Sequence, residues 1–130
     1  MKILVGYDGS NAAKEAMTQA AKQAKAFGGS VTVLVSLTGG TVTHETELAQ
    51  ANEDMKFAEK VFKDAGISCE TKLMIRGNTP GVDMVEFARE NHIDMIVIGI
   101  RRRSKLDKLL FGSNAQYIVI KAHCPVLCVK

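Results

Sequence analysis

The chain alternates between two hydrophobic periods, one typical of strands and one typical of helices. Two short runs, centred on Val5 and Val97, are apolar on both faces, and strands of that kind lie in the middle of parallel sheets. A later run instead places Glu70 and Lys72 opposite its apolar residues, which favours the edge of a sheet. The pattern predicts five strands, over residues 1–7, 31–35, 69–75, 94–98 and 125–129.

Between the predicted strands, apolar residues recur three and four positions apart, as they do on the buried face of a helix. Gly28 and Gly66 end the first two helices, since glycine tolerates the left-handed backbone of a helix C-terminus. Thr79, directly before a proline, predicts the N-cap of the third helix. Ser113, with a glutamine three positions later, forms a capping-box pattern and predicts the N-cap of the fourth. The apolar stripes run over residues 13–27, 48–65, 80–88 and 113–122.

Five strands alternating with four helices predict an α/β domain with a parallel sheet, because right-handed crossovers return the chain in the same direction. The two most apolar strands belong in the centre, which gives the Rossmann-like strand order 3-2-1-4-5 with four flanking helices. At 130 residues the chain has the size of one domain, spanning residues 1–130. A crevice is expected at the carboxyl ends of strands one and four, where the sheet switches direction. Asp8 and Gly9 follow the first of these strands, and Gly99 ends the second.

The loop after the fourth strand carries most of the positive charge. Between Gly99 and Gly112, five cations stand against the single anion Asp107, a net charge of +4, while the whole chain carries +3. The remaining residues therefore sum to about −1, whereas a protein that binds nucleic acid is expected to present a broad basic face. The local charge favours a small anionic ligand. The five cations are Arg101, Arg102, Arg103, Lys105 and Lys108.

The two ends of this basic loop suit a phosphate group. Gly99 ends a buried strand, where glycine leaves room for a ligand or for an unusual backbone angle. Gly112 and Ser113 offer the free amides of a helix N-terminus, worth roughly half a positive charge, and arginine guanidinium groups match phosphate oxygens. Taken singly, these residues are also what an ordinary turn, cap or solvated loop contains. Asp8 has two interpretations as well: an acceptor for sugar hydroxyls or an amino group, or a turn residue that bonds its own backbone.

The sequence lacks the motifs of several other kinds of phosphate-binding protein. A P-loop needs G-x4-G-K-S/T and a dinucleotide-binding turn needs G-x-G-x-x-G after the first strand, and neither occurs. A phosphoacceptor receiver domain needs carboxylates after the first and third strands, but the third ends in Ile75 and Arg76. No activated nucleophile, carboxylate pair or water-positioning base indicates an enzyme, so we expect at most slow, incidental hydrolysis of a phosphate ligand.

The composition predicts a cytoplasmic protein that is not associated with a membrane. No segment approaches the roughly 18 apolar residues of a membrane span, and the N-terminus lacks a signal-peptide pattern. Three cysteines form no disulfide framework, which agrees with a reducing compartment. Cys124 and Cys128, four apart on a predicted strand, would lie roughly 13 Å apart, too far to share an ion. We therefore expect these two to be buried thiols.

The last strand predicts a dimer. It ends the chain with Val126, Leu127 and Val129 at an expected sheet edge. Exposed edges present unpaired backbone groups, and pairing with a twofold-related copy would satisfy them.

Several motifs together resemble the universal stress protein family over essentially the whole chain. They are K-I-L-V-G-Y-D-G-S at the start, R-G-N-T-P before the third helix, D-M-I-V-I-G after it, and L-L-F-G-S ahead of C-P-V-L-C-V-K. The ATP-binding branch of that family has the pattern G-x2-G-x9-G-S/T. Gly99, Gly112 and Ser113 match this pattern in spacing, while Arg102 stands at the position of the second glycine.

The resemblance implies an adenine nucleotide alpha hydrolase-like fold, dimers through the last strand, and ATP or another adenine nucleotide at the switch point, with Mg²⁺ as a candidate companion. By position, Asp8 and its neighbour Gly9 would face the ribose or adenine, and the backbone near Ser36 would meet the adenine. The phosphate end would be held by Gly99, Gly112, Ser113 and Asn114, with Arg101, Arg102 and Arg103 beside it.

The implied role is nucleotide binding in stress response or signalling rather than catalysis. Arg102 is expected to weaken or alter nucleotide selectivity, because a glycine there lets the backbone approach the phosphates. The alternative is a dimeric interaction protein whose cleft binds no nucleotide, or only an anion, and whose arginines contact an acidic partner.

Overall fold

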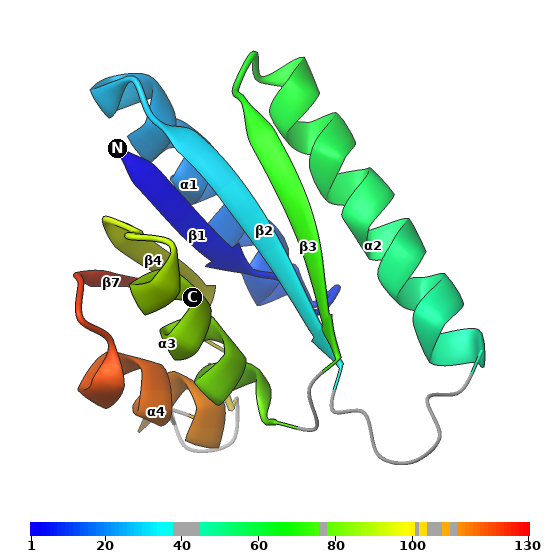
Figure 1. The fold of residues 1–130 in the computed structure, drawn as a ribbon, viewed down its shortest axis with the longest axis vertical. Coiled ribbons are helices and arrows are strands. Elements are labelled where there is room, and N and C mark those ends of the chain that lie inside the picture. Colours follow the sequence, from blue (N-terminus) through cyan, green and yellow to red (C-terminus); the bar gives the residue numbers. More distant parts are fainter. Residues whose placement is uncertain (38–44, 76–77, 101, 104–107, 110–111) are drawn as a thin grey trace.

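The structure, a computed structural model, describes residues 1–37, 45–75, 78–100, 102–103, 108–109 and 112–130. Along the chain, the five strands of its main sheet alternate with four helices (Figure 1). In chain order the elements are β1 (Lys2–Gly6), α1 (Asn11–Phe27), β2 (Ser30–Leu37), α2 (Glu45–Asp64), β3 (Cys69–Ile75), α3 (Pro80–Glu90), β4 (Met95–Gly99), β5 (Arg102–Arg103), β6 (Lys108–Leu109), α4 (Ser113–Lys121) and β7 (Val126–Val129).

The main sheet is parallel, with the strand order β3-β2-β1-β4-β7. Because β7 is the fifth strand of this sheet, the predicted order 3-2-1-4-5 is confirmed. Val5 of β1 pairs with Val33 of β2 on one side and Val97 of β4 on the other, and all three side chains are fully buried. The polar alternation in β3 matches its place at one edge, as predicted.

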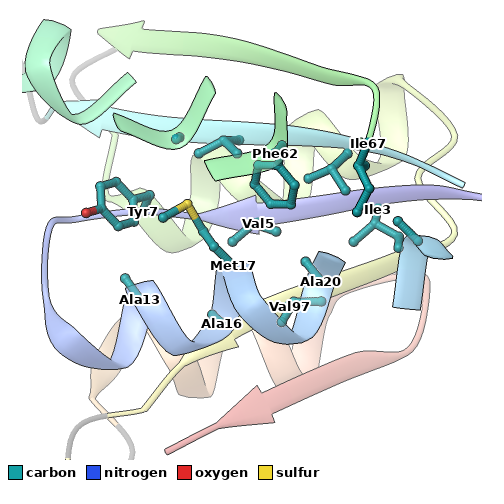
Figure 2. Packing of buried hydrophobic residues seen from close by; sticks show 14 of the residues in the cluster. Ile3, Val5, Tyr7, Ala13, Ala16, Met17, Ala20, Phe62, Ile67 and Val97 are labelled. Carbon is teal, nitrogen blue, oxygen red and sulfur yellow. The ribbon is translucent and has the colours of Figure 1, made fainter. Parts of the chain in front are cut away.

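Helices cover both faces of the sheet (Figure 1). On one face, α1 and α2 pack on the side chains that include Ile3, Val5 and Val97, and Figure 2 shows Met17 of α1 and Phe62 of α2 reaching into this layer. The alanines of α1 let that helix lie close to the sheet, since short side chains shorten the distance between packed elements. On the opposite face, α3 and α4 cover Leu4, Leu34 and Ile96 among other residues.

The helix ends agree with the predictions in three cases and differ in one. Gly28 ends α1 with a φ of 65°, and α2 is followed by Gly66 with a φ of 72°. Thr79 is the N-cap of α3, although its side chain makes no capping hydrogen bond. The predicted capping box of the last helix is wrong, because Gly112 is the N-cap of α4 and Ser113 is already its first helical residue.

The start of α4 makes a tertiary contact with the start of α3 that sequence spacing does not predict. The backbone N–H of Gly81, in the first turn of α3, donates to Asn114 Oδ1 over 3.0 Å. A Cβ atom at Gly81 would lie 3.0 Å from the backbone oxygen of Asn114, which is tighter than most real Cβ contacts. Glycine at this position therefore lets the two helix starts pack closely.

A short hairpin inside the basic loop was not predicted. Arg102 pairs with Leu109 and Arg103 with Lys108 as two antiparallel strands, β5 and β6, apart from the main sheet. The segment has no run of alternating residues, so it lacks the signal by which strands are predicted. Within the described part of the chain, no helix combines the length and the hydropathy that a membrane span needs.

Candidate functional site

A pocket of about 170 Å³ lies at the carboxyl ends of β1, β2 and β4, where the topology predicts a crevice. Its other walls come from the first turns of α1, α3 and α4. The volume is below the roughly 300 Å³ at which pockets for drug-sized ligands begin, so it suits part of a larger ligand. The lining residues are Gly6, Tyr7, Asp8, Ser10, Ala13, Leu34, Ser36, Pro80, Met84, Ile98, Gly99, Asn114, Ala115 and Ile118.

Four of the predicted site residues meet in this pocket although they are far apart in the sequence. They are Asp8, Ser36, Gly99 and Asn114. Gly9 and Ser113 are each next in sequence to lining residues, and Gly112 lies two positions before Asn114. Arg101 lies outside the described residues, and for Arg102 and Arg103 only the backbone of β5 is described.

The turn after β1 is held by its own side chains. Asp8 Oδ1 accepts a hydrogen bond from the backbone N–H of Ser10 over 2.9 Å, and Gly9 between them has a φ of 81°, which favours glycine. Ser10 Oγ then accepts from the N–H of Ala13 over 3.1 Å and caps α1. The turn interpretation of Asp8 is therefore confirmed, and the same residue lines the pocket.

Gly99 serves a purpose different from the one that its sequence context suggests. Its φ is not in the left-handed region. A Cβ atom on Gly99 would lie 2.7 Å from the backbone nitrogen of Ala13 in α1, closer than real Cβ atoms approach. The glycine is thus required by the passage of α1 over the end of β4, and the expectation of an unusual backbone angle is corrected. Gly99 also lines the pocket, so the expectation that it leaves room for a ligand stays a prediction.

Gly112, unlike Gly99, is not in a crowded position among the described residues. Its φ is −66° and it is exposed, and a Cβ atom there would meet nothing within 4 Å among the described residues. Neither its backbone conformation nor its packing against the described residues therefore requires a glycine at this helix N-terminus. Asn114, two residues further on, lines the pocket while its Oδ1 atom accepts a hydrogen bond from the N–H of Gly81.

Sequence reasoning missed a buried carboxylate on α3, which is hydrogen-bonded to Ser36 of the β2 wall but does not itself line the pocket. Asp83, in the first turn of α3, is 0% exposed, and its Oδ2 atom accepts a short hydrogen bond from the hydroxyl of Ser36. Its Oδ1 atom is buried without a hydrogen-bond partner among the described residues. The sequence did contain one sign of this residue: Asp83 interrupts the apolar stretch from Val82 to Val85, where a charged side chain is unexpected.

Tyr7 closes the pocket on the α2 side. Its ring stacks on Phe57, with 6.1 Å between ring centroids and an interplanar angle of 25°. Burial, and then the negative charges of Asp54 and Asp8, raise the pKa of the Tyr7 hydroxyl above 10.0. Tyr7 is therefore a neutral, mainly apolar part of the wall at physiological pH.

Among the described residues, no group of three or more His, Cys, Asp or Glu side chains could hold a metal ion. The pocket instead combines apolar walls with a few polar groups at separate strand ends, an arrangement typical of sites for small organic ligands.

Comparison with known proteins identifies the family. The model of the universal stress protein family matches residues 1–130. A universal stress protein of Methanocaldococcus jannaschii is 33% identical over 140 residues, which cover 99% of this chain and 81% of that protein. A solved universal stress protein of Archaeoglobus fulgidus is 39% identical with a TM-score of 0.91, and the match covers 100% of this chain and 98% of that one. A universal stress protein from the same organism, solved in complex with dAMP, is 36% identical with a TM-score of 0.87 and the same coverage. On this evidence the chain belongs to the universal stress protein family.

Proposed function

We propose that this protein binds an adenine nucleotide in the pocket between β1 and β4 and acts in stress response or signalling rather than as a catalyst. The observation that carries this proposal is the pocket itself, which lies at the topological switch point of the sheet. The relative from Archaeoglobus fulgidus that was solved with dAMP matches this chain over its whole length. A cytoplasmic homodimer that changes partner affinity with nucleotide state is the form in which we expect it to act.

The distribution of charge around the pocket supports a phosphate on its α4 side. The first turn of α4 directs free backbone N–H groups outward from Ser113, and the basic loop precedes it in the chain. Gly112 fits this role because its open surroundings leave room for a ligand close to the backbone. Asp8 and Ser36 lie on the other strand ends, where a sugar or a base would supply hydrogen-bonding groups instead.

Arg102 decides how many phosphates the site accepts in this proposal. It replaces the glycine that, in the ATP-binding branch of the family, lets the backbone approach the phosphates. We therefore expect AMP to bind at least as well as ATP. Replacing Arg102 by glycine should raise the affinity for ATP and leave the affinity for AMP nearly unchanged.

Isothermal titration of the purified protein with AMP, dAMP, ADP and ATP, each with and without Mg²⁺, tests the proposal. Saturable binding of at least one adenine nucleotide below millimolar concentration is the expected result. Absence of saturable binding at millimolar ligand, in both the natural protein and the Arg102→Gly variant, contradicts it and favours a dimeric interaction protein with an empty or anion-filled cleft. In that case Arg102→Gly should leave nucleotide binding unchanged and weaken binding of the acidic partner, whereas under the proposed function it should raise the affinity for ATP and leave partner binding unchanged.

A further inference from the structure

Ser36 and Asp83 form a polar pair between β2 and α3, 47 positions apart in the sequence. Ser36 lines the pocket, and its hydroxyl donates to Asp83 Oδ2. Asp83 has no exposed surface, so water cannot compete for this hydrogen bond from the solvent side. Leu34, two residues earlier on β2, faces the same α3 layer, as the alternation of a strand requires.

This pairing fixes what the serine can offer to a ligand. A serine hydroxyl has one proton to donate and two lone pairs that accept. Because the proton is directed to the carboxylate, only lone pairs remain for a group in the pocket. The second carboxylate oxygen, Asp83 Oδ1, is itself a buried acceptor with no donor among the described residues. Asp83 does not line the pocket, so the group that a ligand meets on the β2 wall is the Ser36 hydroxyl, an acceptor that calls for a hydrogen-bond donor.

The opposite wall has the reverse preference. The N-terminus of α4 presents N–H groups and the positive end of the helix dipole, and Asn114 from this turn lines the pocket. An anionic group is favoured on that side and is disfavoured next to the carboxylate of Asp83. A nucleotide with its phosphate toward α4 consequently directs its base toward Ser36.

On the basis of the nucleotide binding proposed above, we infer that Asp83 is a positioning residue that makes Ser36 an acceptor and thereby selects bases with an exocyclic amine over bases with a carbonyl at the same position. The 6-amino group of adenine supplies N–H donors, whereas the 6-oxo group of guanine or hypoxanthine supplies only an acceptor. A carbonyl facing Ser36 would leave two acceptors without a proton between them, and buried polar groups without partners are unfavourable.

The test compares AMP with IMP, which carry the same sugar and phosphate and differ at the 6 position. In the natural protein, calorimetry should give a dissociation constant for AMP at least tenfold below that for IMP. Ser36→Ala should reduce this ratio to less than threefold, because the acceptor is gone. Asp83→Asn should also reduce it, since the amide N–H can donate to Ser36 and release the serine proton toward the pocket. Ser36→Thr keeps a hydroxyl and should keep the ratio.

Controls separate this inference from folding effects and from the proposed function. Ser30→Ala makes the same change at the exposed far end of β2 and should leave both constants unchanged. If Ser36→Ala does not fold because Asp83 loses its donor, the double variant Ser36→Ala/Asp83→Ala removes both groups and should still lose discrimination. Equal affinities for AMP and IMP in the natural protein, or an unchanged ratio in Ser36→Ala, would overturn the inference. Failure of the natural protein to bind either nucleotide would overturn the proposed function instead.

Discussion

At the scale of single residues, glycine stands at the two motif positions of the basic loop for different physical reasons. Gly99 is needed by the protein itself, because the backbone of α1 passes where its Cβ atom would be. Gly112 has an ordinary φ, and no residue in the described part of the chain comes within 4 Å of where its Cβ atom would be. A sequence pattern treats the two glycines alike, whereas the structure separates one that packing explains from one that packing does not explain.

Replacing each glycine by alanine should therefore have opposite effects on stability and binding. Gly99→Ala forces backbone atoms apart and should cost about 3 kcal/mol of unfolding free energy, lowering the melting temperature by roughly 10 °C. Gly112→Ala should cost less than about 1 kcal/mol, the loss expected for a poorer N-cap, yet weaken nucleotide binding about tenfold. Thermal unfolding and calorimetry on both variants measure this. Equal melting temperatures for the two variants would contradict the packing argument for Gly99.

The cysteines should be unreactive in the folded protein. Burial, followed by the negative charges of Glu59 and Glu70, raises the pKa of Cys69 to about 11. Burial is also the main reason why the pKa values of Cys124 and Cys128 are raised. At pH 8 the thiolate fraction of Cys69 is roughly a hundredfold below that of an ordinary thiol.

Alkylation of Cys69 by iodoacetamide at pH 8, followed by mass spectrometry, should be about a hundredfold slower than in the guanidinium-unfolded chain. Its rate should rise about tenfold for each pH unit between 8 and 10, because the thiol titrates only near pH 11. A rate that levels off below pH 9.5 would show that the folded thiol has an ordinary pKa.

At the scale of elements, helix starts depend on whether a capping side chain is engaged. Ser10 caps α1 through a hydrogen bond to Ala13, whereas Thr79 occupies the same position before α3 without such a bond. The propensity rule predicts a threonine cap and is correct about where α3 begins. It does not indicate how strongly that cap contributes, since this depends on the orientation of one side chain.

The two caps therefore form a matched pair for mutation. Ser10→Ala should lower the free energy of unfolding by about 1 kcal/mol, and Thr79→Ala by less than about 0.5 kcal/mol. Urea denaturation followed by circular dichroism measures both values. Ser10→Asp, which retains a capping oxygen, should recover most of the loss. A larger effect at Thr79 than at Ser10 would contradict the hydrogen-bond assignment.

At the scale of the whole molecule, the edge strand β7 is only partly covered by other elements. Val126 to Val129 of β7 are all half-buried, and Ile120 on the neighbouring helix α4 is 74% exposed. Ile96 and Ile100 donate to the carbonyls of Pro125 and Val129, so the backbone groups of the odd-numbered residues face β4. Those of Val126 and Cys128 consequently face outward, as the alternation of a parallel ladder requires.

We therefore expect a homodimer through β7, and Cys128 provides a backbone test of it. Cys128→Pro removes an outward-facing N–H that the β7–β4 ladder does not use, a position where an edge strand tolerates proline. This variant should be a monomer by light scattering, while Cys128→Ser, which keeps the N–H, should remain a dimer. Circular dichroism checks that both variants fold. A monodisperse monomer of the natural protein would contradict the prediction.

The sequence by itself determined the architecture and the place of the site. Strand and helix periods differ enough to be separated in one chain, and right-handed crossovers then leave few orders for five parallel strands. The runs around Val5 and Val97 indicated the central strands, and the central strands locate the switch point. Asp8 and Gly99 were therefore predicted to lie near one another, and the family resemblance added Ser36 and Asn114. All four line one pocket.

Only the tertiary structure decided what the individual side chains do there. Asp83 is buried because α3 lies over the end of β2, and its bond to Ser36 joins two elements that no local pattern connects. The hydrogen bond from Gly81 to Asn114 joins the starts of α3 and α4, and the need for Gly99 depends on the path of α1. Local propensities act over a few residues, whereas these contacts arise from how layers pack, and so they appear only once the chain is folded.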